Sequence, residues 1–309
     1  MLGLARRAGI SVALLAAALA LLGGSTSAAA SSPSAAIVAV GAENQYANVI
    51  SQIGGPYVNV SAIESNPNTD PHSFEASPSV AHLVSAARLV VQNGLGYDAY
   101  MNNIEAASPS SERKVIDVQT LLGLPNSTAN PHLWYAPVTM PTLARALASD
   151  LSALEPAHAA YFKANATTFD DSLKPWFAAL AAFAARYPKI PVATTEPVGD
   201  YMLQAAGAVI KTPFPLQADI MNGVDPAPQA VSIQDSLFSE HRVKVFVYNE
   251  QVTDSLTASF LAKAKQAGIP VVGVYETMPT PGYDYQSWML AELTALRNAV
   301  ADKRSTQKL

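Results

Sequence analysis

Two histidines stand in closely similar local sequences. His72 lies in NTDPHSFEASPS, residues 68–79, and His132 lies in NPHLWYAP, residues 130–137. The preceding residues, Pro71 and Pro131, have a fixed φ near −65°, which limits how far each imidazole can move. A neutral imidazole offers one ring nitrogen to a metal ion while an acceptor holds its other N–H. The pair therefore predicts half of one metal site.

Two acids follow apolar strand-like segments in matching positions. Glu196 ends IPVATTE, and Glu276 ends IPVVGVYE. In parallel α/β sheets, ligand groups gather at the carboxyl ends of the strands. Two imidazoles and two carboxylates would neutralise a divalent cation, so the expected metal ligands are His72, His132, Glu196 and Glu276. Glu250, in VYNEQVTDS, also follows a strand and is the alternative to Glu276, and a water molecule is another.

Each of these residues also has an ordinary structural interpretation. A single histidine near a strand end is usually structural, and Glu196 could stabilise a helix N-terminus through the macrodipole. Asp70 could simply cap a turn. His82 falls inside a helical pattern and is expected to be at the surface or packed.

The elements that must position these residues alternate along the chain. Short β-rich runs are followed by helical patterns up to residue 153, and the alternation begins again at residue 189. Such alternation predicts an α/β protein with two lobes, each with a central, mostly parallel β-sheet flanked by helices. We expect the N-terminal lobe at 31–153 and the C-terminal lobe at 189–309. Residues 212–228, TPFPLQADIMNGVDPAP, read as an irregular surface loop.

Residues 154–188 are almost uniformly helix-forming and contain no glycine. One helix of about 30 residues would extend about 45 Å, which suits a long rigid helix that links the two lobes. Pro175 is its interior breaker and could kink it or divide it into two helices.

The N-terminus has the features of a cleavable signal peptide. Arg6 and Arg7 precede an apolar run, and small residues follow it, so residues 1–30 are expected to be removed on export. Neither that run nor any later one reaches the roughly 20 residues of a membrane span. The chain contains no cysteine, which excludes thiolate ligands, disulfides and a lipid-anchor cysteine. We expect a periplasmic protein.

The amino-acid composition limits the kinds of molecule that the protein can bind. The net charge is −5, half of the residues are hydrophobic and 14% are charged, which argues against nucleic acid as a partner. The two lobes can bury large cores.

Several motifs resemble those of the solute-binding proteins of zinc and manganese ABC importers. DPHSFEASPS resembles the first-ligand motif of that family, and NPHLWYAP resembles the second. LVVQNGLGYDAY is similar to the strand and helix between them, and TTEPVGDY to the glutamate version of the third motif. The chain differs from the family in two respects: Glu276 stands where an aspartate is usual, and residues 106–130 lack a His-rich loop.

The resemblance implies a monomeric binding protein that captures one divalent transition metal ion between two lobes and delivers it to an ABC importer permease. Oxygen ligands favour manganese relative to a three-histidine site, while the intrinsic order of affinities favours zinc, and ferrous iron is a further candidate. A metal-dependent hydrolase or a metal-stapled surface adhesin is the alternative. The chain has no His-Glu-x-x-His motif, so we expect binding rather than catalysis.

Overall fold

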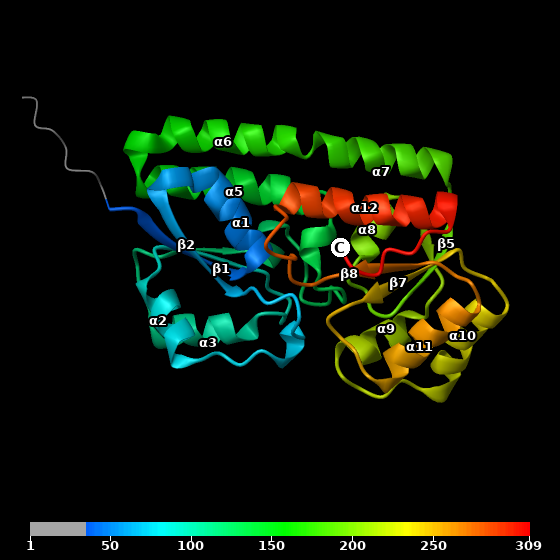
Figure 1. The fold of residues 1–309 in the computed structure, drawn as a ribbon. Coiled ribbons are helices and arrows are strands. Elements are labelled where there is room, and N and C mark those ends of the chain that lie inside the picture. The colour runs from blue at the N-terminus through cyan, green and yellow to red at the C-terminus, as the bar shows by residue number, and fades with distance from the viewer. Residues whose placement is uncertain (1–34) are drawn as a thin grey trace, which may run out of the picture. The chain divides into compact units, whose positions relative to one another are not determined.

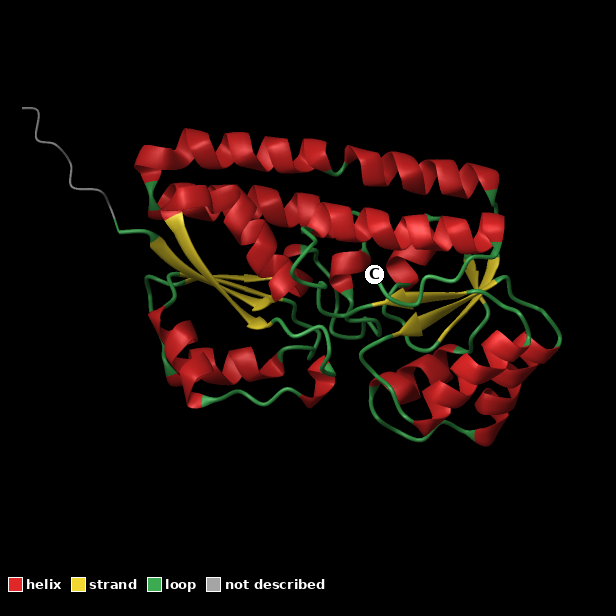
Figure 2. Ribbon diagram, in the orientation of Figure 1, coloured by secondary structure: helices red, strands yellow, loops and turns green. Residues whose placement is uncertain are grey.

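The computed structural model describes residues 35–309, and the expected signal peptide at 1–30 lies outside the described residues. Residues 35–309 form one compact unit that contains two parallel sheets (Figures 1 and 2). None of the helices in this part of the chain is both long and apolar enough to cross a lipid bilayer. The predicted α/β fold with two lobes is confirmed.

The two sheets have the same topology. The first has the order β2-β1-β3-β4 and the second has the order β6-β5-β7-β8, with every pair of neighbouring strands parallel. Parallel strands need crossover connections, so helices cover both faces, and the strands are mostly apolar on both sides. The strands are β1 Ile37–Glu43, β2 Val58–Glu64, β3 Leu89–Gln92, β4 Lys114–Asp117, β5 Pro191–Thr194, β6 Val209–Ile210, β7 Val245–Asn249 and β8 Val271–Val274.

A layer of long helices extends over both sheets, and shorter helices cover their other faces (Figure 1). The layer of long helices consists of α5, α6, α7 and α12. On the opposite side, α2 and α3 lie against the first sheet, and α9, α10 and α11 lie against the second. The longer helices are α1 Asn44–Gly54, α2 Pro78–Ala86, α3 Ala99–Ala107, α5 Thr139–Leu154, α6 Ala159–Ser172, α7 Lys174–Arg186, α9 Phe214–Met221, α10 Pro228–Ser239, α11 Ser255–Gln266 and α12 Tyr285–Asp302. The short ones are α4 Val118–Leu121 and α8 Asp200–Ala205, with 3₁₀ turns at Gly55–Tyr57, Pro71–Ser73, Leu133–Tyr135 and Pro156–His158.

The segment between the lobes forms two helices instead of one. Helix α6 ends at Ser172 and α7 begins at Lys174, so the break falls beside Pro175. A proline lacks the N–H that would continue the hydrogen-bond ladder, but it fits the first turn of a new helix. The two helices follow each other along one edge of the molecule in Figure 1.

The interpretation of residues 212–228 as an irregular loop was wrong. Helix α9 occupies Phe214–Met221, and its first turn contains Pro215. A proline in the first turn of a helix loses no hydrogen bond, so Pro215 does not prevent the helix.

One hydrophobic core joins the two lobes. A single cluster of buried side chains includes Ile37 and Val91 of the first sheet and Val247 and Val272 of the second. The aromatic rings of Trp134, Tyr135, Trp176, Tyr285 and Trp288, which belong to the same cluster, are all almost completely buried. Separating the lobes would therefore expose a large apolar surface, which opposes wide opening.

A buried acid holds this aromatic core together. Oε1 of Glu292, on α12, accepts hydrogen bonds from Tyr135 Oη at 2.9 Å and from Trp288 Nε1 at 2.7 Å. Burial raises the pKa of Glu292 to about 8, although these two hydrogen bonds oppose the shift. The folded protein therefore holds a proton on Glu292 at neutral pH.

Glu292 makes the stability of the metal-free protein depend on pH. Its pKa is raised by folding, so its contribution is complete below the unfolded value of about 4.3 and is lost as the pH rises through about 8. Between pH 6 and pH 8 we expect this residue alone to lower the free energy of unfolding by about 2 kcal/mol. Urea unfolding at both pH values measures this difference in the free energy of unfolding. Glu292→Gln should reduce the difference by about 2 kcal/mol, whereas the exposed control Glu112→Gln should leave it unchanged. An equal pH dependence in wild type and Glu292→Gln would contradict the assignment.

Candidate metal centre

His72 is presented by a short 3₁₀ turn after β2. Pro71 begins the turn, and Asp70 Oδ1 accepts a hydrogen bond from the backbone N–H of His72 at 2.8 Å. Asp70 thus caps the turn, as its structural interpretation expected. The His72 side chain keeps 25% of its surface exposed, and a cavity of about 530 Å³ opens beside it, with Asp70 and Asp254 in its lining.

His132 is completely buried in the loop before the turn Leu133–Tyr135. Asn130 fixes the orientation of its ring, because Asn130 Oδ1 lies 2.8 Å from His132 Nδ1 and also accepts the His132 backbone N–H at 3.0 Å. Asn130 Nδ2 donates to the carbonyl of Pro197 at 2.8 Å, which fixes which end of the amide is oxygen. Nδ1 of His132 therefore carries the proton in the neutral ring, and Nε2 is left with a lone pair.

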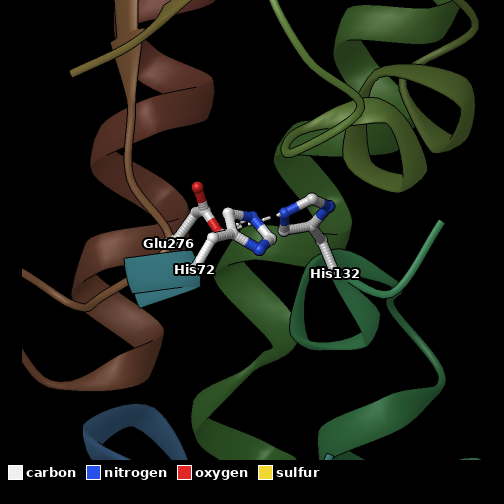
Figure 3. A group of neighbouring side chains, drawn as sticks. All are labelled: His72, His132 and Glu276. Carbon is white, nitrogen blue, oxygen red and sulfur yellow. Dashed lines mark hydrogen bonds and ion pairs between the residues drawn. The ribbon is translucent and has the colours of Figure 1, made fainter. Parts of the chain in front are cut away.

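Both imidazoles face one carboxylate oxygen. His72 Nε2 lies 3.1 Å and His132 Nε2 lies 3.2 Å from Glu276 Oε2. Figure 3 shows the three side chains converging, and one ligand atom from each lies within 4.8 Å of those of the other two. Two atoms bound about 2.1 Å from a tetrahedral ion lie about 3.4 Å apart, so one ion could contact all three side chains with small shifts.

The pKa values follow from burial and from this contact. Burial alone would lower the pKa of His72, but the hydrogen bond to Glu276 and its negative charge outweigh burial and raise it. Burial lowers the pKa of His132, which keeps this ring neutral. Burial would raise the pKa of Glu276, but its contacts with His132 and His72 hold it well below its usual value. His132 Nε2 and Glu276 Oε2 are thus two acceptors that face each other, an arrangement suited to a shared cation.

Glu196 lies beside this group, and its carboxylate is joined to that of Glu276 by a single side chain. Asn249 Nδ2 donates to Glu196 Oε1 at 3.1 Å and to Glu276 Oε1 at 2.7 Å. Glu196 is 2% exposed, and its Oε2 atom has no hydrogen-bond partner among the described residues. Burial, followed by the nearby charge of Glu276, raises the pKa of Glu196 well above its usual value. The structure therefore brings His72, His132 and Glu276 into one group and places Glu196 at its edge.

Glu250 lies elsewhere. Burial raises its pKa, although a hydrogen bond to Gln307 and the charge of Lys308 oppose the shift. Both of these partners are C-terminal residues, so Glu250 faces the C-terminus and not the histidines. Of the two acids that the sequence left open, Glu276 is the one beside the histidines.

The loop that carries Glu276 is attached to the first lobe, although it follows β8 of the second sheet. Asn44, at the start of α1, bonds both the N–H and the carbonyl of Met278, at 2.9 and 2.8 Å. Gln45 Nε2 donates to the Glu276 carbonyl at 3.1 Å, and Tyr135 Oη lies 2.8 Å from the Tyr275 carbonyl oxygen. These bonds fix Glu276 relative to both histidines.

Aromatic rings enclose the inner side of the group. Trp134 packs edge-on against His132, with ring centroids 5.4 Å apart, and is itself completely buried. Tyr97 Oη donates to Glu276 Oε2 at 2.9 Å. These rings exclude water, which strengthens electrostatic attraction to an ion.

Sequence reasoning missed several residues that shape this site, namely Asn44, Gln45, Tyr97, Asn130 and Asn249. Asn249 ends a predicted strand in the same way as Glu196 and Glu276 follow theirs, so the carboxyl-edge pattern could have identified it. The other residues form side-chain hydrogen bonds that leave no periodic signal.

Two parallel α/β lobes with a shared core, and with side chains that could ligate a metal ion at the carboxyl edges of the sheets, are the features expected of a metal-binding solute-binding protein. The family model for the periplasmic zinc-uptake complex component A, ZnuA, matches residues 40–299. The chain belongs to this family of solute-binding proteins of zinc and manganese ABC importers, which are transport components, and the comparisons give no support to a metallohydrolase or an adhesin.

Curated relatives include manganese-binding and zinc-binding proteins. The manganese-binding lipoprotein MntA of Bacillus subtilis is 23% identical over 271 residues, which cover 85% of this chain and 87% of MntA. The zinc-binding protein AdcA of Streptococcus pyogenes serotype M1 is 26% identical over 182 residues, which are 56% of this chain and 33% of AdcA. The match thus spans about a third of the length of AdcA.

Solved structures share the fold. A periplasmic metal-binding protein from Candidatus Liberibacter asiaticus aligns with a TM-score of 0.69 at 17% identity, covering 85% of this chain and 99% of that chain. A ZnuA crystal structure aligns with a TM-score of 0.68 at 20% identity, and the alignment covers 86% of this chain and 98% of the ZnuA chain.

Proposed function

We propose that the protein captures one divalent transition metal ion with His72, His132 and Glu276, that Glu196 supplies the fourth ligand, and that the ion is then delivered to the permease of an ABC importer. The observation that carries the proposal is the pair of imidazole nitrogens 3.1 and 3.2 Å from one buried carboxylate oxygen. Family membership supports the transport role.

The cargo is zinc or manganese, with ferrous iron as a third candidate. Two imidazoles and two carboxylates suit any of these ions, and relatives named for zinc and for manganese both occur. The cavity beside His72 gives the ion a route from solvent.

The protein acts in the periplasm as a monomer, after removal of residues 1–30, and has lobes at 31–153 and 189–309 with the linking segment 154–188 between them. It binds its ion without catalysis, because four protein ligands in a buried site leave no open position for a substrate and water.

Metal content tests this proposal. Protein purified from the periplasm without chelator should contain one ion per chain by mass spectrometry, and the Glu276→Gln variant should contain much less. Competition titration with zinc, manganese and ferrous iron then identifies the cargo. Metal-free protein that also fails to bind any of the three ions would contradict the proposal.

A further inference from the structure

Asn249 stands between the two carboxylates because of the strand order. β7 lies between β5 and β8 in the second sheet, and Asn249 is its last residue. Glu196 follows β5 and Glu276 follows β8, so the side chain that ends the middle strand separates the two acids. Asn249 is completely buried.

The orientation of the Asn249 amide is fixed by its own hydrogen bonds. Oδ1 accepts the backbone N–H of Gln251 at 3.0 Å, so the opposite end of the amide is the NH₂ group. Each of its two N–H groups is directed to a different acid, one to Glu276 Oε1 at 2.7 Å and one to Glu196 Oε1 at 3.1 Å.

The amide therefore occupies one oxygen of each carboxylate. Glu276 keeps Oε2, the atom that faces both histidines, and Glu196 keeps Oε2, which has no hydrogen-bond partner among the described residues. The hydrogen bond from Asn249 engages one lone pair of Oε1 in each acid, whereas Oε2 of Glu276 accepts from Tyr97 and faces the histidines. Ligation through Oε1 as well as Oε2 therefore competes with the amide, which favours binding through Oε2 alone. The four side chains then offer two nitrogens and two oxygens.

Four ligands suit zinc better than manganese. Zinc in closed protein sites is almost always four-coordinate and tetrahedral, whereas manganese favours octahedral coordination that is rich in oxygen. We infer that Asn249 determines metal specificity, because it limits Glu196 and Glu276 to one ligand oxygen each and so favours zinc over manganese. This inference rests on the proposed function and narrows its cargo.

Cobalt(II) reports the coordination number directly, because tetrahedral cobalt absorbs visible light strongly and six-coordinate cobalt absorbs weakly. The cobalt-loaded wild-type protein should show the strong spectrum. Asn249→Leu keeps the branched shape of the side chain but removes the NH₂ donor, and Asn249→Ser can donate to only one of the acids. Both variants should give weaker spectra and a ratio of zinc to manganese affinity at least about tenfold lower than that of the wild type.

Gln217→Leu is a matched control. Gln217 is 2% exposed, lies in the same lobe, and its Nε2 donates to Thr194 Oγ1 at 2.7 Å and to Asp200 Oδ2 at 2.9 Å. This variant also loses a buried amide that bridges two oxygens, but both of those oxygens belong to residues outside the metal group. Its cobalt spectrum and its affinity ratio should remain those of the wild type.

Three results would overturn the inference: a weak, six-coordinate cobalt spectrum in the wild type, a zinc to manganese ratio unchanged in the Asn249 variants, or an equal change in Gln217→Leu. If either leucine variant does not fold, the wild-type spectrum and Asn249→Ser still decide. A wild-type protein that binds none of these ions would instead contradict the proposed function itself.

Discussion

Replacing His132 with alanine should lower the affinity for zinc by about two to three orders of magnitude. Structural zinc sites bind with about 10–16 kcal/mol in total, so one of four ligands accounts for about 2.5–4 kcal/mol. Among the proposed ligands, His132 has the most firmly fixed side chain, because it is completely buried and Asn130 holds its ring. Removing it leaves Glu276 with one imidazole in place of two. Competition with a chromophoric chelator at pH 7.5 measures the loss.

His82→Ala is the control for this substitution. His82 belongs to the same lobe but lies exposed on α2, so its removal should change the affinity by less than about twofold. Circular dichroism should show that both variants are folded. Retention of wild-type affinity by His132→Ala would remove His132 from the ligand set.

Acid should release the metal, beginning near neutral pH. In the metal-free protein, Glu276 raises the pKa of His72 above its ordinary value of about 6.5. An ion must displace that proton, so the affinity is highest above this pKa and falls about tenfold for each pH unit below it. Between pH 7.5 and pH 5.5 the affinity should therefore decrease by up to about 100-fold. His132 adds little over this range, because burial lowers its pKa.

Calorimetry can measure the number of protons released on metal binding, independently of the affinity. Titrations with zinc at pH 6.0, in two buffers with different ionisation enthalpies, should show the release of about one proton per ion from His72 and of a further proton from Glu196, whose pKa is raised by burial. A matched pair of titrations at pH 8.5 should show less release from His72. An affinity that stays constant from pH 7.5 to pH 5.5 would mean that His72 is neutral before the ion binds.

The fold could be predicted from the sequence because its signals are local. The alternation of short β-rich runs and helical patterns predicted the two parallel sheets, and Glu196 and Glu276, which follow strand-like segments, indicated the edge at which ligands were expected. The prolines were harder to interpret than the strand patterns. Pro175 marks a break between two helices, whereas Pro215 lies in the first turn of a helix that was expected to be a loop. A proline restricts the backbone in both cases, and the sequence does not show which element it starts or ends.

The finer organisation of the site could not be predicted. The position of Asn249 at a strand end follows the carboxyl-edge pattern, but its donation to two acids at once does not, and Asn44 acts by bonding a loop more than 200 residues away. These contacts depend on side-chain positions that the folded chain sets, and no spacing in the sequence reports them. The histidines could be found because they lie in paired motifs, whereas an isolated buried amide such as that of Asn130 carries no comparable signal.

The attachment of the Glu276 loop to α1 also bears on when during biogenesis the protein acquires its cargo. The two ends of the chain must meet before Asn44 can bond Met278, and contacts of such large sequence separation form late in folding. A nascent or partly translocated chain presents His72 and His132 without Glu276, and so lacks a complete site. The compartment in which folding is completed, with its own supply of ions, therefore decides which metal the new protein first encounters.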